Sequence, residues 1–150
     1  MSETSQAPSM PASRKVLCAV YPAIAVVALI ATWSQNLVYQ NAALDVFTTF
    51  WRETKVTPAS RSITVDIFLF GLAAVIFMVI EARKHGVRYV WAYIVGGIFI
   101  AISVTFPLFL LARELRLNAS EAPSLPVKDT VLLTLFAVLT LAATLWVDVG

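Results

Sequence analysis

The sequence contains very few of the residues from which metal centres, disulfides and redox sites are built. Of its 150 residues, one is cysteine and one is histidine. A single cysteine, Cys18, excludes an intramolecular disulfide and any multi-thiolate metal or iron–sulfur site within one chain. The single histidine, His85, cannot build a histidine-rich metal site and is expected to be a solvated turn residue. We therefore expect no metal and no cofactor.

Charge is also scarce. Asp, Glu, Lys and Arg together make up 13% of the chain, the formal net charge is +2, and no basic run is longer than Arg83-Lys84-His85. We expect no nucleic-acid partner, because such partners require a basic patch or stripe. The sequence contains no HExxH, GxSxG or CxxC motif and no glycine-rich phosphate loop. We therefore expect that the protein is not an enzyme.

What the sequence has in abundance is long apolar runs. A helix of roughly 20 residues matches the membrane hydrocarbon thickness of about 30 Å. The mean hydropathy is +0.82, and 59% of the residues are hydrophobic. Four runs reach the required length, at residues 16–33, 63–82, 89–112 and 130–147. These runs predict an all-α integral membrane bundle of four transmembrane helices, formed by one domain over residues 14–150.

The segments outside the runs predict how the chain lies in the membrane. Residues 1–13 form a tail rich in Ser, Pro and Ala that is predicted to be disordered. Arg14-Lys15 before the first run indicates an uncleaved signal-anchor helix in the cell inner membrane. If the chain crosses the membrane four times, five Lys or Arg residues lie on one side of the membrane and six on the other, so their number does not decide the orientation. The positive charges are denser before the first run and in the 83–88 turn, which predicts that both termini are cytoplasmic.

The first loop contains a further amphipathic segment, which predicts a short interfacial helix over about residues 42–54. Its apolar and polar residues separate onto two faces at helical spacing, and Thr57-Pro58 marks its end. The helix is too short and too polar on one side to span the membrane, and we expect it to lie steeply inclined to the spans. Phe47 and Trp51 should face lipid or the bundle.

Two acidic residues lie within the apolar runs. Asp66 is costly inside a membrane and should face the bundle or water. If the third run is a straight helix antiparallel to the second, Thr105 lies level with Asp66 and can hydrogen-bond to it, whereas Arg113 lies further out. Glu81 is expected to form an interfacial salt bridge beside Arg83 and Lys84. Asp66, Thr105, Arg113 and Glu81 are therefore the candidate residues for a ligand or proton site.

A set of polar residues and one apolar motif occurs in order through this region: Asp66, Glu81-Ala82-Arg83, Gly86, Trp91, Pro107-Leu108-Phe109-Leu110 and Arg113-Glu114. Together they resemble a bacterial family of small multi-pass membrane proteins, the domain-of-unknown-function family 2834. The resemblance extends over roughly residues 16–117, and members of the family usually have three spans, so the fourth run is a departure. The resemblance implies a membrane architecture but no activity.

Two functional interpretations follow from the sequence. The first is a structural or accessory subunit that contacts the lipid bilayer and other membrane protein subunits, or that self-associates. The second is a small membrane enzyme or carrier for an apolar lipid or isoprenoid ligand, with Asp66 as its acid or proton site. A carrier requires a pocket that reaches Asp66, whereas a subunit requires an apolar face.

Overall fold

The computed structural model describes residues 10, 12–37, 45–117 and 126–149, and these contain helices and turns but no strand. Four helical stretches are long and apolar enough to cross a membrane. They are α1 (Ala12–Asn36), α3 (Pro58–His85), the stretch Val90–Glu114 and α6 (Val127–Val149). The prediction of an all-α membrane protein with four such stretches is confirmed. The predicted disordered tail, residues 1–13, lies almost wholly outside the described residues.

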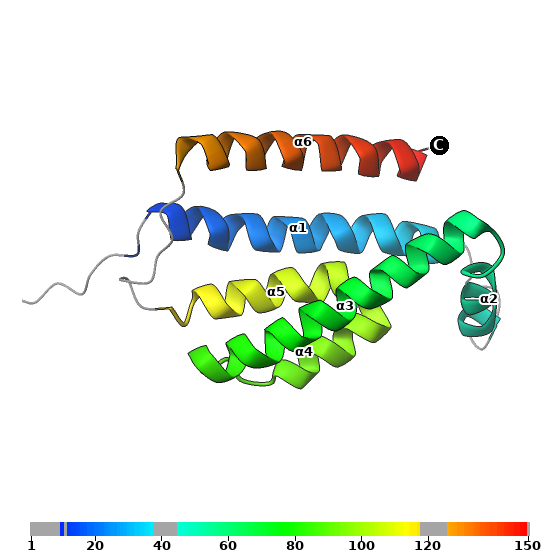
Figure 1. Cartoon of the computed structure of the whole chain (residues 1–150), viewed down its shortest axis with the longest axis horizontal. Helices are drawn as coiled ribbons and strands as arrows, with labels where there is room; N and C mark the ends of the chain where they lie inside the picture. Colours follow the sequence, from blue (N-terminus) through cyan, green and yellow to red (C-terminus); the bar gives the residue numbers. More distant parts are fainter. Residues whose placement is uncertain (1–9, 11, 38–44, 118–125, 150) are drawn as a thin grey trace, which may run out of the picture.

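Local sequence determines both ends of α3. Thr57 accepts a hydrogen bond from the backbone N–H of Ser60, the Ser60 side chain bonds back to the Thr57 backbone, and Pro58 occupies the first turn. This capping box satisfies N–H groups that have no partner within the helix. Gly86 ends the helix in the left-handed conformation with φ 66°, which glycine adopts without steric cost. The chain then reverses into Val90, so the predicted antiparallel hairpin after α3 is confirmed (Figure 1).

The third stretch is folded back on itself. It consists of α4 (Val90–Gly96), the π-helical turn η2 (Gly97–Ala101) and α5 (Ile102–Glu114). Ala101 has φ 175° and ψ 141°, an extended conformation that interrupts the helix. The rings of Tyr93 and Phe109 are 5.9 Å apart between centroids. In a straight helix, these residues would be separated by roughly 24 Å. The stretch is therefore a helical hairpin whose two ends lie at the same end of the bundle (Figure 1).

Two adjacent glycines allow the hairpin arms to approach closely. A Cβ atom on Gly97 would lie 3.0 Å from Thr105 Oγ1, and a Cβ on Gly96 would lie 3.2 Å from Thr105 Cγ2. Both distances are shorter than ordinary van der Waals contacts. Small residues serve the same purpose at membrane helix interfaces, where close backbone approach increases van der Waals contact.

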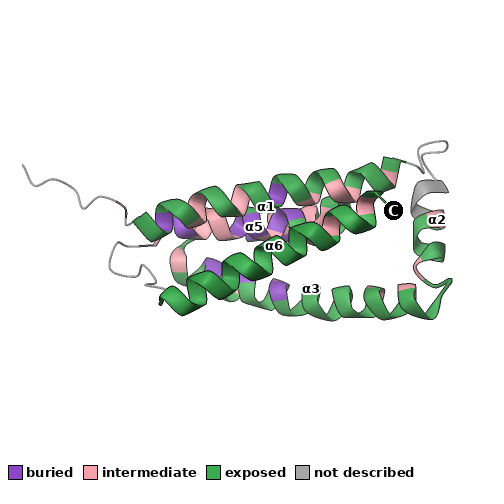
Figure 2. Ribbon diagram, turned by 90° about the horizontal axis from the view of Figure 1, so that it is seen from above, coloured by how far each residue is buried: buried purple, intermediate pink, exposed green. Residues whose placement is uncertain are grey.

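The core lies between the hairpin and the C-terminal half of α3, and α1 packs along α5 on the other side. Figure 2 shows that the buried residues are concentrated in this region, whereas the N-terminal half of α3 is exposed. The core cluster consists of Met78, Ala82, Val87, Val90, Ile94 and Phe109. We name the two ends of the bundle by the α1 residues found there, the Arg14 end and the Trp33 end.

The short helix α2 (Asp45–Glu53) lies across the Trp33 end, roughly perpendicular to α1 (Figure 1). The ring of Trp51 packs against Phe68 of α3, with a centroid distance of 5.8 Å. These observations confirm a helix steeply inclined to the spans with Trp51 turned towards the bundle. The predicted start, residues 42–44, lies outside the described residues, and so does the side chain of Phe47.

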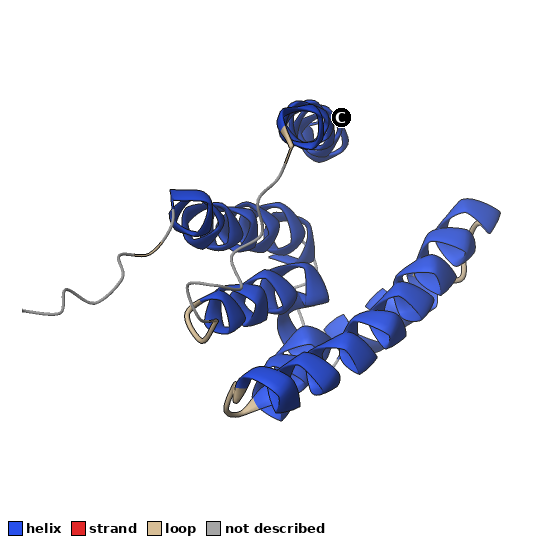
Figure 3. Ribbon diagram, turned by 60° about the vertical axis from the view of Figure 1, so that its left-hand side comes forward, coloured by secondary structure: helices blue, strands red, loops and turns tan. Residues whose placement is uncertain are grey.

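Helix α6 runs beside α1 in the same direction and is set apart from the other helices (Figure 3). None of its residues is buried. Its contact at the Trp33 end is polar, since Gln35 Nε2 donates to Asp148 Oδ1 at 2.8 Å and Ser34 Oγ donates to the same oxygen at 3.1 Å. Because α1 and α6 are parallel, the described N- and C-terminal residues lie at opposite ends of the molecule (Figure 1). The prediction that both termini are cytoplasmic assumed that the third stretch is straight and crosses the membrane.

Candidate functional site

Charged side chains from three helices meet inside the Arg14 end. Arg14, near the start of α1, is 3% exposed, and Glu114, the last residue of α5, is 2% exposed. Arg14 Nε lies 3.5 Å from Glu114 Oε2, and Arg14 also donates through Nη2 to the backbone carbonyl of Glu114. This pair joins residues that are 100 positions apart in the sequence. It attaches the start of α1 to the end of the hairpin.

The cluster continues from α5 to α3 through Arg113. Arg113 Nη1 donates to Glu114 Oε1 at 3.2 Å, and Arg113 Nε donates to Glu81 Oε2. His85 Nε2 lies 3.3 Å from the same Glu81 oxygen, one helical turn further along α3. We call these five residues, Arg14, Glu81, His85, Arg113 and Glu114, the ion-pair network.

The network is balanced in charge, with two arginines facing two carboxylates. Removing charges from water is expensive, and a buried pair recovers the cost only when its hydrogen bonds are made. The loss of one member would leave the others buried without a counter-charge, which typically costs about 3–5 kcal/mol. The arrangement therefore acts as a clamp that holds α1, α3 and α5 together at one end.

Two sequence predictions concern residues of this network. Glu81 does form an ion pair, but with Arg113, and His85 lies beside it, whereas Arg83 and Lys84 are exposed. The prediction that His85 is solvated is wrong, because its side chain is 7% exposed. The four-residue spacing places His85 on the same face of α3 as Glu81, and that face packs against the hairpin.

The predicted contact between Asp66 and Thr105 is not formed. Asp66 is exposed, while Thr105 is buried against the glycines of the hairpin and its Oγ1 has no hydrogen-bond partner in the described part of the chain. Thr105 lies about 12 Å of helix from Arg113, and Asp66 lies about 22 Å of helix from Glu81. Because Arg113 and Glu81 touch, Asp66 and Thr105 differ in depth by roughly 10 Å. The fold-back at Ala101 therefore brings together two of the four candidate residues, Glu81 and Arg113, and separates the other two.

Two surface depressions of the described residues are not lined by Asp66. One, of about 590 Å³, lies along the leucine-rich face of α6. The other, of about 560 Å³, lies beside α2 and is lined by Trp51, Arg52 and Lys55. Within the described ranges, no group of three or more His, Cys, Asp or Glu residues is placed to hold a metal ion.

Sequence reasoning missed the Arg14–Glu114 pair and the pairing of Arg113 with Glu81. Both pairs form only because the third stretch folds back, so that its last residues lie at the same end of the bundle as its first residues. The available signal was the glycine pair Gly96-Gly97 with the polar residues Ser103 and Thr105 in the middle of an apolar run. These residues are better suited to a close turn than to a lipid-facing helix.

Comparison with known proteins identifies the family of the chain. Residues 20–115 match the family described as Protein of unknown function DUF2834. This range covers more than half of the sequence, and the chain belongs to that family. The match includes α3 and the hairpin but neither Arg14 nor α6. No curated protein and no solved structure matches the chain.

Proposed function

We propose that this member of the DUF2834 family is a non-enzymatic accessory subunit of a membrane protein complex. The observation that carries the proposal is the exposed tip of the hairpin. Ile98 and Phe99 at the tip are 68% and 65% exposed, beside the backbone break at Ala101. Irregular backbone facing lipid is unfavourable in a membrane, because lipid tails cannot replace the missing hydrogen bonds.

The hydrogen-bond inventory of the tip supports the same conclusion. An α-helix that starts after a break leaves its first N–H groups without intrahelical acceptors, and the start of α5 has no side-chain cap. One carbonyl at the tip is satisfied, since Trp33 Nε1 donates to Ile100 O at 3.2 Å. A protein surface that covers the tip would exclude lipid and supply further polar partners.

The neighbouring half of α3 offers a second uncovered surface. Ile67, Phe68, Leu69 and Phe70 are consecutive, and each is 49–64% exposed. Consecutive residues point to all sides of a helix, so this part of α3 presents apolar side chains around much of its circumference. Such a surface beside an exposed hairpin tip is suited to packing against helices of another subunit.

Site-specific photo-crosslinking tests the proposal. A benzophenone amino acid at Phe99 should give one discrete protein adduct in living cells, because the tip is covered by a partner. The same amino acid at Ile24, which is 46% exposed on α1, is the matched control. If both positions give the same diffuse lipid adducts, the tip faces lipid and the proposal fails.

The fold-back also determines the orientation that we propose. Eight of the 11 lysines and arginines lie at the Arg14 end, and Arg52, Lys55 and Arg61 lie at the Trp33 end. The five-to-six count of the sequence becomes eight to three because Arg113, Arg116 and Lys128 move to the other end. The positive-inside rule then favours a cytoplasmic Arg14 end in a cell inner membrane, with the N-terminus inside and the C-terminus outside. The eight residues are Arg14, Lys15, Arg83, Lys84, Arg88, Arg113, Arg116 and Lys128.

Reporter fusions distinguish this orientation from one with both termini inside. Alkaline phosphatase fused after Gly150 should be active, because it folds outside the cytoplasm, while green fluorescent protein at the same position should be dark. A fluorescent fusion with an inactive phosphatase fusion would place the C-terminus inside and reject the orientation.

A further inference from the structure

We propose that the Arg14 end binds the phosphate groups of anionic phospholipids through a ring of exposed cations, which we call the basic collar. All of its members are exposed, and none forms an ion pair within the described residues. The collar consists of Lys15, Arg83, Lys84, Arg88, Arg116 and Lys128.

The tertiary structure assembles the collar from segments far apart in the sequence. Lys15 lies in the first turn of α1, Arg83 and Lys84 in the last turn of α3, and Arg88 in the turn that follows. Arg116 follows the end of α5, and Lys128 lies in the first turn of α6. A straight third stretch would have carried the last two to the opposite face of the membrane. The reversal at Ala101 places all six at the same end of the bundle.

The ion-pair network takes up the two buried acids at this end of the bundle, so those two acids do not neutralise the collar. Glu81 and Glu114 are buried and contact Arg14, Arg113 and His85, so their charges are already matched. Among the described residues, Asp129 of α6 is the remaining acid at this end. At the Trp33 end, by contrast, the described segments contain three Lys or Arg residues and four acids, Asp45, Glu53, Asp66 and Asp148. The excess positive charge therefore belongs to one end of the molecule.

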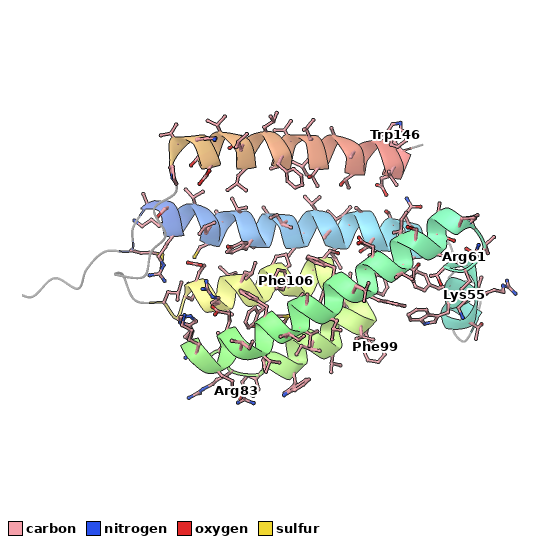
Figure 4. The ribbon with its side chains drawn as sticks, in the orientation of Figure 1. Lys55, Arg61, Arg83, Phe99, Phe106 and Trp146 are labelled. Carbon is pink, nitrogen blue, oxygen red and sulfur yellow. The ribbon has the colours of Figure 1, made fainter. Side chains whose placement is uncertain are left out.

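The surroundings of the collar match a lipid headgroup better than a free ion. Every helix beside it exposes apolar side chains, along which acyl chains can lie. Tyr89 and Trp91 are 81% and 59% exposed next to Arg88, and exposed Tyr and Trp are typical of the headgroup level. Figure 4 shows Arg83 pointing away from the bundle at this end. Lysines and arginines near the surface of an anionic leaflet bind it additively.

The test uses the purified full-length protein in neutral detergent, titrated with fluorescent phosphatidylglycerol or fluorescent phosphatidylcholine. The collar variant is Arg83→Gln/Lys84→Gln/Arg88→Gln, and the matched control is Arg52→Gln/Lys55→Gln/Arg61→Gln at the other end. We expect the collar variant to bind phosphatidylglycerol at least about tenfold more weakly than the wild type. The control should bind as the wild type does, and phosphatidylcholine should show no difference among the three proteins.

Several outcomes would overturn the proposal. Equal losses in the two triple variants would mean that total charge matters and not the collar. Equal binding of phosphatidylglycerol and phosphatidylcholine by the wild type would show that binding does not depend on the negative charge of the lipid. Displacement of the lipid by inorganic phosphate as effectively as by unlabelled phosphatidylglycerol would identify a free-anion site instead.

A second variant covers the case in which the triple variant fails to fold. Arg83→Lys/Arg88→Lys preserves the charges and should retain phosphatidylglycerol binding that weakens as salt is raised, because exposed charges are screened. Loss of binding in this folded, charge-preserving variant would contradict the proposal. The expectation does not depend on an accessory role, so the crosslinking experiment at Phe99 can fail while the lipid experiment succeeds.

Discussion

The two ends of the bundle are built from the same helices but are held together differently. At the Arg14 end, α1, α3 and α5 converge on buried, fully charged side chains. At the Trp33 end, the described contacts include the ring packing of Trp51 on Phe68 and hydrogen bonds in which at most one partner is charged, such as Trp33 to Ile100 and Gln35 to Asp148. Figure 2 shows α3 close to the other helices at the first end and separated from them at the second.

The difference shows how a small membrane protein can combine a rigid part with an open one. Apolar packing between helices gains little from a hydrophobic effect in lipid, since lipid tails are as apolar as the side chains. Buried ion pairs supply directional contacts where the helices converge. The end that lacks them leaves the hairpin tip and half of α3 uncovered. The structure thus predicts strong effects of mutation at the Arg14 end and weak effects at the Trp33 end.

The largest effect is expected for Glu114→Leu. This change leaves Arg14 and Arg113 buried without their carboxylate, and it should lower the free energy of unfolding by about 3–5 kcal/mol. Reversible unfolding in mixed micelles, followed by circular dichroism, measures it. The double change Arg14→Met/Glu114→Leu should cost less than Glu114→Leu alone, because it removes one of the stranded charges. A double variant that is as unstable as the sum of the two single variants would show that the pair is not coupled.

A smaller effect is expected for Gly97→Ala in the hairpin. The added methyl group would lie 3.0 Å from both Thr105 Oγ1 and Ile102 Cδ1, so these packed side chains must shift or the two arms must move apart. Overpacking of this kind typically costs about 1–3 kcal/mol. The matched control is Gly71→Ala in α3, where the new methyl group meets no atom within 4 Å. If the two variants unfold at the same denaturant concentration, the arms are not closely packed at Gly97.

At the Trp33 end, Asp148→Ala should have a modest effect. It removes the acceptor of the hydrogen bonds from Ser34 and Gln35, which join α6 to α1. An exposed bond of this type contributes about 0.5–1.5 kcal/mol. The change should be visible as faster proteolysis of α6, with the unfolding of the rest of the bundle unchanged. Destabilisation as large as that of Glu114→Leu would contradict the comparison between the two ends.

The smallest effect is expected at Asp66. The residue is exposed and makes no hydrogen bond or ion pair with the described residues, so Asp66→Asn and Asp66→Leu should each change the stability of the isolated protein by less than about 0.5 kcal/mol. A hydrogen bond from Thr105 to Asp66, as the sequence predicts, would instead make Asn better tolerated than Leu at this position. A clear difference between the two variants in micelles would restore that pairing.

Much of the fold could be predicted because it depends on local chemistry. Hydropathy and length identify the four stretches, since a membrane helix must match the hydrocarbon thickness. The bounds of α3 follow from Thr57-Pro58 and Gly86, whose caps and turn use residues that are adjacent in the sequence. The amphipathic period of α2 predicts its inclined position and the inward side of Trp51. The candidate site was predicted only in part. The sequence identified Glu81 and Arg113 as candidate residues, but it did not predict that they contact each other.

What only the tertiary structure decided is the path of the third stretch. Its residues are apolar throughout and long enough to cross the membrane, so hydropathy cannot distinguish a straight helix from a hairpin. The choice is made by contacts between residues far apart in sequence, namely Gly97 with Thr105, Tyr93 with Phe109, and Arg14 with Glu114. Composition determined that this protein is helical and lies in a membrane, because those properties depend on the side chains of each segment alone. The clamp, the collar and the positions of the termini depend on one reversal at Ala101, which is stabilised by partners that no single segment contains.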